Sequence, residues 1–253
     1  MNRHSVFNHL EVFPAVDDLY IAAAEFIVSI ANKAIAKNGR FIISLSGGQT
    51  PVKLYSILAQ DPFRNQIEWK KVFIFWGDER CVPLEDEQNN AYQAKVTWLN
   101  KVDVPPSNIH IIPVNLKPAE AAKQYEKKIN DFFGNSPKQF DIVLLGLGEN
   151  GHTASLFPGT NVLNEQAEGI REVYVEEEKM FRITMTAPLI NKAHHILFLV
   201  SGKKKAKILE NIMQGPYQPE KYPAQLINPV EADLRWFADS AAATSVLLKN
   251  LES

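Results

Sequence analysis

His152 is the residue of this sequence most strongly marked for a chemical role, because it follows the glycine-rich segment Gly146-Leu147-Gly148-Glu149-Asn150-Gly151. Histidine changes its charge near neutral pH and therefore suits proton transfer. The segment comes directly after an apolar run, residues 142–145, that is typical of a buried strand. We therefore predict that the glycines let the loop wrap around a small ligand and place the His152 imidazole beside that ligand.

The same six residues match the G-x-G-x-x-G pattern of dinucleotide-binding proteins. That pattern requires a full helix after the glycines, whereas here only residues 152–157 come before Pro158-Gly159. We therefore reject a dinucleotide site and predict that the protein uses no cofactor. We also predict no metal site, because no His-x-x-x-His or Cys-x-x-Cys spacing is present. The remaining histidines carry no comparable pattern: His4, His9, His110, His194 and His195.

A second loop, residues 46–50, has the composition of a binding site for an anion. It lies between an apolar run at 41–45 and a predicted helix at 52–59, with Thr50 as the expected N-cap and Pro51 as the first helical residue. Backbone N–H groups at the start of a helix attract anions. A plain strand-to-helix turn is the alternative that this motif leaves open. The candidate phosphate-binding residues of this loop are Ser46, Gly47, Gly48, Gln49 and Thr50.

Two further basic segments support a site for an anion. Lys203, Lys204 and Lys205 occupy the expected first turn of a helix at 203–213, where their charges oppose the helix dipole. An anionic ligand would relieve that conflict. We therefore predict that Lys205 contacts a phosphate while its neighbours extend into water. Arg182, in the segment RITMTAP, is the second candidate for this contact.

Three charged residues, Asp78, Glu79 and Arg80, follow the apolar run at 72–76 and are predicted to form a loop. The planar guanidinium of Arg80 can bind a phosphate or a carboxylate, and the two acids can orient it or accept hydrogen bonds from sugar hydroxyls. A salt-bridged loop without a binding role is the alternative. Cys81, the single cysteine, is expected to be a bystander, because no sequence feature indicates a base beside it.

These loops need elements that bring them together, and the remaining pattern predicts such a framework. Runs that are apolar on both faces are typical of parallel strands covered by helices. We therefore predict an α/β fold with a mainly parallel sheet, right-handed crossovers and a small strand-rich subregion near 160–185. In that subregion, Glu176-Glu177-Glu178-Lys179 is interpreted as a solvated turn between strands at 172–175 and 181–185. The predicted central strands lie at 41–45, 72–76, 142–145 and 196–200, and the predicted helices at 52–59, 91–99, 119–133 and 203–213.

The bulk composition is that of an ordinary globular protein. The chain has 253 residues, of which 45% are hydrophobic and 22% charged, enough to bury a sizeable core. We expect a single domain over residues 1–253, as a monomer or a weak homo-oligomer. The formal net charge of −2 gives no indication of a nucleic-acid partner or an acidic membrane surface.

Three features favour a cytoplasmic protein that does not bind membranes. The apolar segment at 19–36 carries Glu25, Asn32 and Lys33, and its apolar residues recur at helical spacing. We therefore predict an amphipathic helix packed on the sheet, not a membrane span. The N-terminal residues MNRHSVFNHLEVF lack the apolar core of a secretory signal, and a single cysteine fits a reducing compartment.

Taken together, the loops resemble those of the 6-phosphogluconolactonases, members of a family that includes glucosamine-6-phosphate isomerases. The matching pieces appear in the family's order and spacing, and YPAQLI and LRWFAD near the end are also similar. The resemblance implies a three-layer α/β/α fold of the isomerase and CoA-transferase type. It also implies hydrolysis of 6-phosphogluconolactone in the oxidative pentose phosphate pathway. The matching pieces are SLSGGQTP, WGDERCVP, Asn89-Asn90, GLGENGHTASLFPG, RITMTAPLIN and SGKKKA.

Two features favour a lactonase over an isomerase of this family. The isomerases usually have a DEY-like tripeptide where this chain has Asp78-Glu79-Arg80. They also follow the Gly-His pair with IAFNEP, whose glutamate supports the catalytic histidine, whereas this chain has TASLFP at 153–158. The alternatives kept are a glucosamine-6-phosphate isomerase or deaminase and a non-catalytic sugar-phosphate sensor.

The partner of the catalytic histidine is where this chain departs from the family. Lactonases commonly have an aspartate two residues before the histidine, and this chain has Asn150. A neutral amide can orient an imidazole by hydrogen bonding, but it cannot stabilise an imidazolium as a carboxylate does. Glu149 and Asp78 are alternative partners. The resemblance thus implies a catalytic set of His152, Arg80, Asp78 and Asn150, with phosphate held by residues 46–50, Arg182 and Lys205.

Overall fold

The computed structural model describes residues 10–251, and within them six parallel strands form a central sheet in the order β1-β9-β8-β5-β2-β3. The mainly parallel sheet predicted from the sequence is therefore confirmed. His4, His9 and most of the segment considered as a secretory signal lie outside the described residues. The strands of this sheet are β1 (Leu10–Phe13), β2 (Phe41–Leu45), β3 (Val72–Trp76), β5 (Ile142–Gly146), β8 (His195–Val200) and β9 (Asp233–Asp239).

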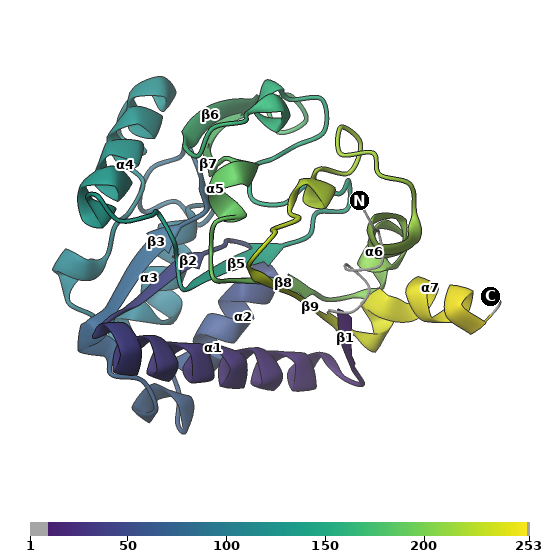
Figure 1. The fold of residues 1–253 in the computed structure, drawn as a ribbon, viewed down its shortest axis with the longest axis horizontal. Coiled ribbons are helices and arrows are strands. Elements are labelled where there is room, and N and C mark those ends of the chain that lie inside the picture. Colours follow the sequence, from purple (N-terminus) through teal and green to yellow (C-terminus); the bar gives the residue numbers. More distant parts are fainter. Residues whose placement is uncertain (1–9, 252–253) are drawn as a thin grey trace.

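Helices cover both faces of this sheet and complete the predicted three layers. Figure 1 shows α1 and α2 on one side of the sheet and α5 and α6 on the other. β2 is buried along its whole length, as expected for a strand between two helical layers. The helices are α1 (Val16–Asn38), α2 (Gln49–Leu58), α3 (Asn90–Thr97), α4 (Pro118–Phe133), α5 (Ala187–Ile190), α6 (Ala206–Gln214) and α7 (Ser240–Leu251).

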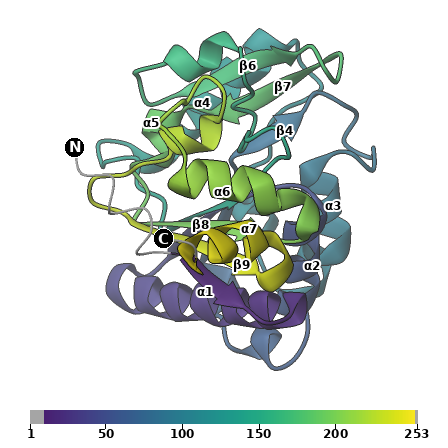
Figure 2. The ribbon, with the colours of Figure 1, turned by 90° about the vertical axis from the view of Figure 1, so that its right-hand side faces the viewer.

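A small antiparallel sheet lies on the side of the central sheet opposite α1, as Figure 2 shows. It contains β4 (Asp78–Arg80), β7 (Met180–Met185) and β6 (Ile170–Val175) in the order β4-β7-β6. The predicted strand-rich subregion is confirmed. The predicted loop at 78–80 is wrong, because these residues pair with β7 and place Arg80 opposite Arg182. Three charged residues show no apolar alternation, so only the tertiary pairing identifies them as a strand.

Helix α1 is long and apolar enough to cross a membrane by length and composition alone. Its apolar face is nevertheless buried, as in the core helix of a globular protein, and the predicted amphipathic helix packed on the sheet is confirmed. The helix ends at Gly39, whose φ of 70° is the left-handed conformation that glycine adopts readily. Its buried side chains are Leu19, Tyr20, Ala23, Ala24, Ile27, Val28, Ile30, Ala31 and Ala34.

Two buried tyrosine hydroxyls hold the chain where strands leave the central sheet. Tyr55 of α2 donates to the Ser46 carbonyl at 2.7 Å and accepts from the Ser46 N–H at 3.1 Å. Tyr125 of α4 makes the same pair of bonds with Trp76, at 3.1 and 2.8 Å. Burial raises the pKa of both phenols, so each stays a neutral group that can donate and accept. The loops after β2 and β3 therefore start from fixed positions.

The topology brings the carboxyl ends of neighbouring strands to one edge of the sheet. From β2 the chain moves outward to β3, and it then returns to β5 on the other side of β2. Such a reversal of strand order leaves a crevice outside the carboxyl ends of the strands, where α/β proteins bind ligands. The loops after β2, β5 and β8 therefore converge beside the small sheet that follows β3.

Candidate active site

A cleft of about 760 Å³ opens at this edge of the sheet. Nearly all of the site residues predicted from the sequence line it, although they come from five separate segments of the chain. Asn150 is the exception among them, and it acts on the cleft through a contact with His152. The predicted residues in the lining are Ser46, Gly47, Gly48, Gln49, Thr50, Asp78, Arg80, His152, Arg182 and Lys205.

The His152 imidazole is held by the side chain of Asn150. Nδ1 lies 2.6 Å from Asn150 Oδ1, and the same oxygen accepts a 3.2 Å hydrogen bond from the His152 backbone N–H. An amide oxygen only accepts hydrogen bonds, so Nδ1 carries the proton of the neutral ring. The other nitrogen, Nε2, is then unprotonated and can act as a base. Asn150, not Glu149 or Asp78, is the hydrogen-bonding partner of His152.

Burial and nearby cations keep the His152 ring neutral. Burial is the largest cause that lowers its pKa to about 3, and the charges of Arg182, Lys205 and Arg80 lower it further. The ring also stacks on Phe157, with centroids 4.0 Å apart and planes 19° from parallel. An anion bound near these cations would offset their charge and raise the pKa of His152. The site therefore becomes more basic when a phosphorylated ligand occupies it.

Gly148 is required for this position of the ring. A Cβ atom at Gly148 would lie 2.1 Å from His152 Nδ1 and 2.2 Å from His152 Cε1, far inside the sum of atomic radii. The Gly148 N–H donates to the His152 carbonyl at 2.8 Å, which closes the loop back on itself. In the structure the loop closes on the His152 ring, and that the glycines let it wrap around a small ligand stays a prediction.

The loop after β2 leads into α2, as predicted, but the helix starts earlier than expected. Gly48 is the N-cap with φ 100°, and the helix begins at Gln49, so the predicted N-cap at Thr50 is wrong. A glycine tolerates this backbone conformation and lets the helix start sooner. Thr50 Oγ1 instead forms a 2.8 Å hydrogen bond with Ser201 Oγ, which joins the loops after β2 and β8. The first N–H groups of a helix have no intrahelical acceptor, and here that helix end lines the cleft.

All three lysines of the loop after β8 line the cleft, and Lys205 is the least exposed of them. Lys203 and Lys204 are exposed, whereas Lys205 is half-buried, and burial is the main reason that its pKa is lowered. The Gly202 N–H is held by both oxygens of buried Asp239, at 3.1 and 3.0 Å. Asp239 ends β9, so a carboxylate from the neighbouring strand fixes the turn that carries Lys205. This aspartate was not identified from the sequence.

Asp78 and Arg182 form a buried charged wall of the cleft. Asp78 Oδ2 accepts a 2.6 Å hydrogen bond from Ser155 Oγ and lies 3.7 Å from Arg182 Nη1. Arg182 Nε donates to Glu178 Oε2 at 2.9 Å, and its guanidinium carbon lies 5.1 Å from the centre of the Phe157 ring. Two carboxylates therefore offset the charge of Arg182, which makes Lys205 and Arg80 the cations more open to a ligand.

Arg80 and Asn90 line the cleft, and each has a buried polar atom without a partner in residues 10–251. Arg80 Nη1 donates to the Gln88 carbonyl at 2.8 Å, while Arg80 Nε and Asn90 Oδ1 are buried without a hydrogen-bond partner among residues 10–251. Buried polar atoms are normally paired. Protein atoms cover both of them, and Asn90 Oδ1 lies where a Cβ at Gly47 would come within 1.8 Å, so the two atoms are unpaired beside the cleft. Asn90 belongs to a segment quoted for the resemblance, but no role was predicted for it.

Glu79, predicted with Asp78 to orient Arg80 or to accept sugar hydroxyls, instead caps α3. Its carboxylate accepts from the backbone N–H groups of Arg80, Asn90 and Ala91 at 2.8, 2.8 and 2.9 Å. Burial raises the pKa of Glu79 to about 7, and these three hydrogen bonds act in the opposite direction. Glu79 thus holds β4 against the start of α3 and fixes the position from which Arg80 extends.

The acidic turn at 176–179 does more than face solvent. It joins β6 to β7 as predicted, but Glu178 pairs with Arg182 and Glu177 accepts a 3.3 Å hydrogen bond from Asn150 Nδ2. The interpretation of this run as a solvated turn is therefore incomplete. A charge run gives no sequence signal for such contacts, because they depend on how the small sheet lies over the loop after β5.

The remaining histidines in residues 10–251 and the cysteine lie in structural positions. The His110 ring stacks on Phe75 with centroids 4.4 Å apart, and burial lowers its pKa to about 4. His195 starts β8, at the end of the strand away from the cleft, and its Nδ1 lies 3.3 Å from Asp233 Oδ2. Burial raises the pKa of Cys81 to about 11, which disfavours the reactive thiolate and agrees with the predicted bystander role.

Residues 14–236 match the protein family described as glucosamine-6-phosphate isomerases/6-phosphogluconolactonase. The chain is 36% identical to a 6-phosphogluconolactonase of Nostoc sp. strain PCC 7120, over 94% of this chain and 98% of that protein. It is 41% identical to a 6-phosphogluconolactonase of Synechocystis sp. strain PCC 6803, over 85% and 88% of the two chains. The chain belongs to this family.

The solved structures of the family show the same fold. The structure of 6-phosphogluconolactonase from Trypanosoma cruzi superimposes with a TM-score of 0.84 at 27% identity, over 94% of this chain and 96% of that chain. The three-layer α/β/α fold implied by the resemblance is therefore confirmed.

At the position after Leu156 this chain differs from the isomerase motif IAFNEP. Counted from the Gly-His pair, the glutamate of the isomerase motif IAFNEP falls at Phe157 in this chain. Phe157 is buried and its ring stacks on His152. A phenyl ring cannot accept or donate the proton that the isomerase glutamate handles. The geometry at this position therefore favours a lactonase.

Several residues of the site were not found from the sequence. Tyr20 comes from α1, more than a hundred residues before His152, and lines the cleft near Thr50 and Ser201. Its helical spacing identifies it only as a core residue. Phe157, Ser201 and Asp239 likewise belong to segments whose chemistry is visible only once the loops are placed together.

Proposed function

We propose that this chain hydrolyses 6-phospho-D-glucono-1,5-lactone to 6-phosphogluconate, a step of the oxidative pentose phosphate pathway in the cytoplasm. One observation supports this most strongly: a neutral imidazole with an unprotonated Nε2 shares a cleft with a helix N-terminus and a half-buried lysine. The imidazole can activate a water molecule for attack on an ester carbonyl. The helix N-terminus and the lysine can bind a phosphate.

The phosphate of the substrate binds at the loop of residues 46–50 and Lys205. The start of α2 offers backbone N–H groups and the positive end of its dipole, and Lys205 adds a full charge from the loop after β8. Thr50 and Ser201 join the two loops through their hydroxyls, so both parts of the phosphate site move as one. Binding energy gained at this distant group orients the lactone carbonyl toward His152.

The reaction at C1 needs one base that later becomes an acid. The oxygen of a water molecule bonds to C1 while His152 Nε2 takes one of its protons and the carbonyl electrons move to the carbonyl oxygen. The carbonyl then re-forms as the bond from C1 to the ring oxygen breaks. His152 returns its proton to that ring oxygen, which becomes the C5 hydroxyl, and the new carboxylic acid ionises in water.

Arg80 and Asn90 bind the sugar end that surrounds this carbonyl. Both residues line the cleft, and Arg80 Nε and Asn90 Oδ1 have no hydrogen-bond partner in residues 10–251. The guanidinium of Arg80 stabilises the negative charge that develops on the carbonyl oxygen. Asp78 holds Ser155 and Arg182 in place and so shapes the wall behind the ring.

The test is hydrolysis of freshly generated lactone with and without its phosphate. We expect kcat/KM for the phosphorylated lactone to exceed that for the unphosphorylated lactone by about 10²-fold or more, because two or more charge-assisted hydrogen bonds are lost. Rates are measured at short times, because the lactone also opens spontaneously. Equal rates for the two lactones would contradict a phosphate site in this cleft.

The same preparation separates this function from the two alternatives. A glucosamine-6-phosphate isomerase or deaminase releases ammonia from glucosamine 6-phosphate, and we expect no ammonia above the background of the uncatalysed reaction. A sugar-phosphate sensor binds 6-phosphogluconate and leaves the lactone untouched, whereas we expect turnover. Ammonia release would contradict the proposal and favour the isomerase or deaminase. Binding without turnover would contradict it and favour the sensor.

A further inference from the structure

Glu177 is connected to His152 through the side chain of Asn150. Asn150 Nδ2 donates to Glu177 Oε2 at 3.3 Å, and Asn150 Oδ1 accepts from the His152 backbone N–H at 3.2 Å and lies 2.6 Å from His152 Nδ1. One amide group thus lies between a carboxylate and the imidazole. Glu177 belongs to the turn between β6 and β7, far in sequence from the loop after β5.

The Glu177 carboxylate and the His152 backbone N–H favour the same orientation of the amide. A carboxylate only accepts hydrogen bonds, so the Asn150 NH₂ group faces Glu177 and the amide oxygen faces His152. With the oxygen toward Nδ1, the ring proton stays on Nδ1 and Nε2 is a base. A reversed amide would present its NH₂ group to Nδ1, and the proton would then have to lie on Nε2, where it blocks the reaction.

We propose that Glu177 is a positioning residue for His152, which keeps the Asn150 amide in the productive orientation and lends negative charge to the imidazolium formed during turnover. The proposal rests on the proposed lactonase function. Glu177 places a negative charge next to the neutral Asn150 amide. The carboxylate polarises the amide, and the polarised amide passes part of this effect to the imidazole ring. The imidazolium needs such support, because Arg182, Lys205 and Arg80 all disfavour a positive ring.

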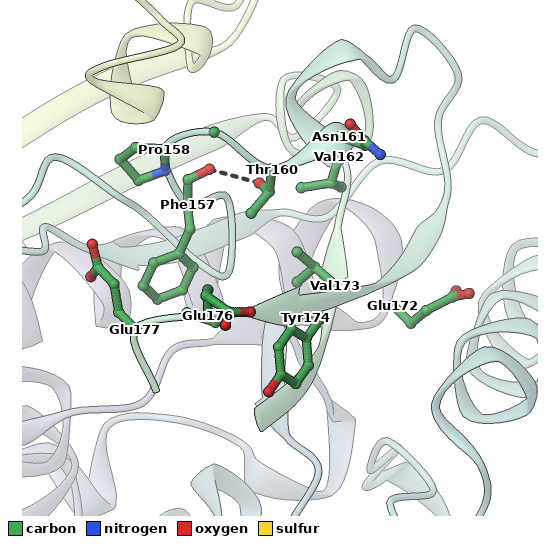
Figure 3. A pocket seen from close by; sticks show the side chains of 12 residues that line it. Phe157, Pro158, Thr160, Asn161, Val162, Glu172, Val173, Tyr174, Glu176 and Glu177 are labelled. Carbon is green, nitrogen blue, oxygen red and sulfur yellow. Dashed lines mark hydrogen bonds between the residues drawn. The ribbon is translucent and has the colours of Figure 1, made fainter. Parts of the chain in front are cut away.

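The surroundings of Glu177 limit the size of this effect. Glu177 and Phe157 both line a second groove, of about 450 Å³, and Figure 3 shows the two side chains at the same end of it, away from Glu172. Glu177 is exposed, so solvent screens its charge. Phe157 and Glu177 therefore act on His152 in different ways. Phe157 packs on the imidazole ring, and Glu177 orients the Asn150 amide.

The first test is the turnover of Glu177→Ala against the matched control Glu176→Ala. Glu176 lies in the same turn and carries the same charge, and it hydrogen-bonds to neither Asn150 nor Arg182. We expect Glu177→Ala to lower kcat by about two- to fivefold with KM little changed, the range for an exposed charged contact. Glu176→Ala should keep the wild-type kcat. Equal values of kcat for the two variants would overturn the proposal.

Transferring the charge to position 150 tells a positioning role from a structural one. In Asn150→Asp the carboxylate contacts Nδ1 directly, so the ring no longer depends on the amide. We expect Glu177→Ala to cause no loss of kcat in the Asn150→Asp background, because the support is then redundant. If Glu177 only stabilises the turn, the same loss appears in both backgrounds, and that result rejects the proposal.

The tautomer of His152 gives a readout that needs no turnover. In ¹⁵N-histidine-labelled protein, the nitrogen shifts of His152 distinguish a proton on Nδ1 from a proton on Nε2. We expect the Nδ1–H form in the wild type, a new share of the Nε2–H form in Glu177→Ala, and the Nδ1–H form again in Asn150→Asp/Glu177→Ala. An unchanged tautomer in Glu177→Ala rejects the proposal, whereas a wild type without lactonase activity rejects the proposed function and leaves this readout intact.

Discussion

His152→Ala is expected to lower kcat for the phosphorylated lactone by about 10²–10⁴-fold, the usual contribution of a general acid–base group. KM should change little, because the residues that bind the phosphate are the loop of residues 46–50 and Lys205, and none of them is removed. The Nε2 atom acts only on the water and the leaving oxygen, so its loss removes an interaction made in the transition state. Initial rates at short times, corrected for spontaneous opening, give both constants.

Two controls separate chemistry from damage to the fold. His195→Ala removes an imidazole from the amino end of β8, where it pairs with Asp233 away from the cleft, and should leave kcat close to the wild-type value. Binding of 6-phosphogluconate to His152→Ala, measured by calorimetry, should persist, because the phosphate site is intact. Near-wild-type kcat in His152→Ala would remove this histidine from the mechanism.

Gly148→Ala is expected to reproduce much of this loss without touching a catalytic group. Its Cβ would lie 2.1 Å from His152 Nδ1, and Phe157 stacks on the ring, so the imidazole must leave its position between them. A displacement of about 1 Å in a catalytic group can cost about 10²-fold in rate, and we expect a fall in kcat of that order. The backbone of Gly148 does not require glycine, since its φ is not positive.

Gly146→Ala is the matched control, because it makes the same change two residues earlier at the end of β5. A Cβ there would meet Ser46 Oγ at 4.0 Å, an ordinary contact, so kcat should stay near the wild-type value. In the His152→Ala background, Gly148→Ala should add no further loss, since both changes remove the same imidazole. A further fall in kcat of about 10²-fold in that background would show that Gly148 supports activity by another route.

The elements that carry the site could be predicted because their patterns are local. Runs such as residues 41–45 and 142–145 are apolar on both faces, and a glycine turn follows each, so parallel strands with loops at one edge are the simplest arrangement. Parallel strands then bring the loop of Ser46 and the loop of His152 together without further information. The position of Lys205 follows in the same way from the run before it.

The contacts that tune the site could not be predicted, because they join segments that no local pattern relates. Glu177 reaches Asn150 only because the small sheet lies over the loop after β5, and Asp239 reaches Gly202 only because β9 lies beside β8. Arg80 extends from a strand, not a loop, because β7 offers its three residues a hydrogen-bonding partner. In each case tertiary pairing decided the outcome over local composition.

A crystal structure with the product 6-phosphogluconate would show whether the phosphate and the reacting carbon occupy opposite parts of one cleft. We expect the phosphate on the first N–H groups of α2 and on Lys205, with a carboxylate oxygen at C1 within hydrogen-bonding distance of His152 Nε2. A product bound in the reverse direction, with its phosphate against His152, would contradict this expectation.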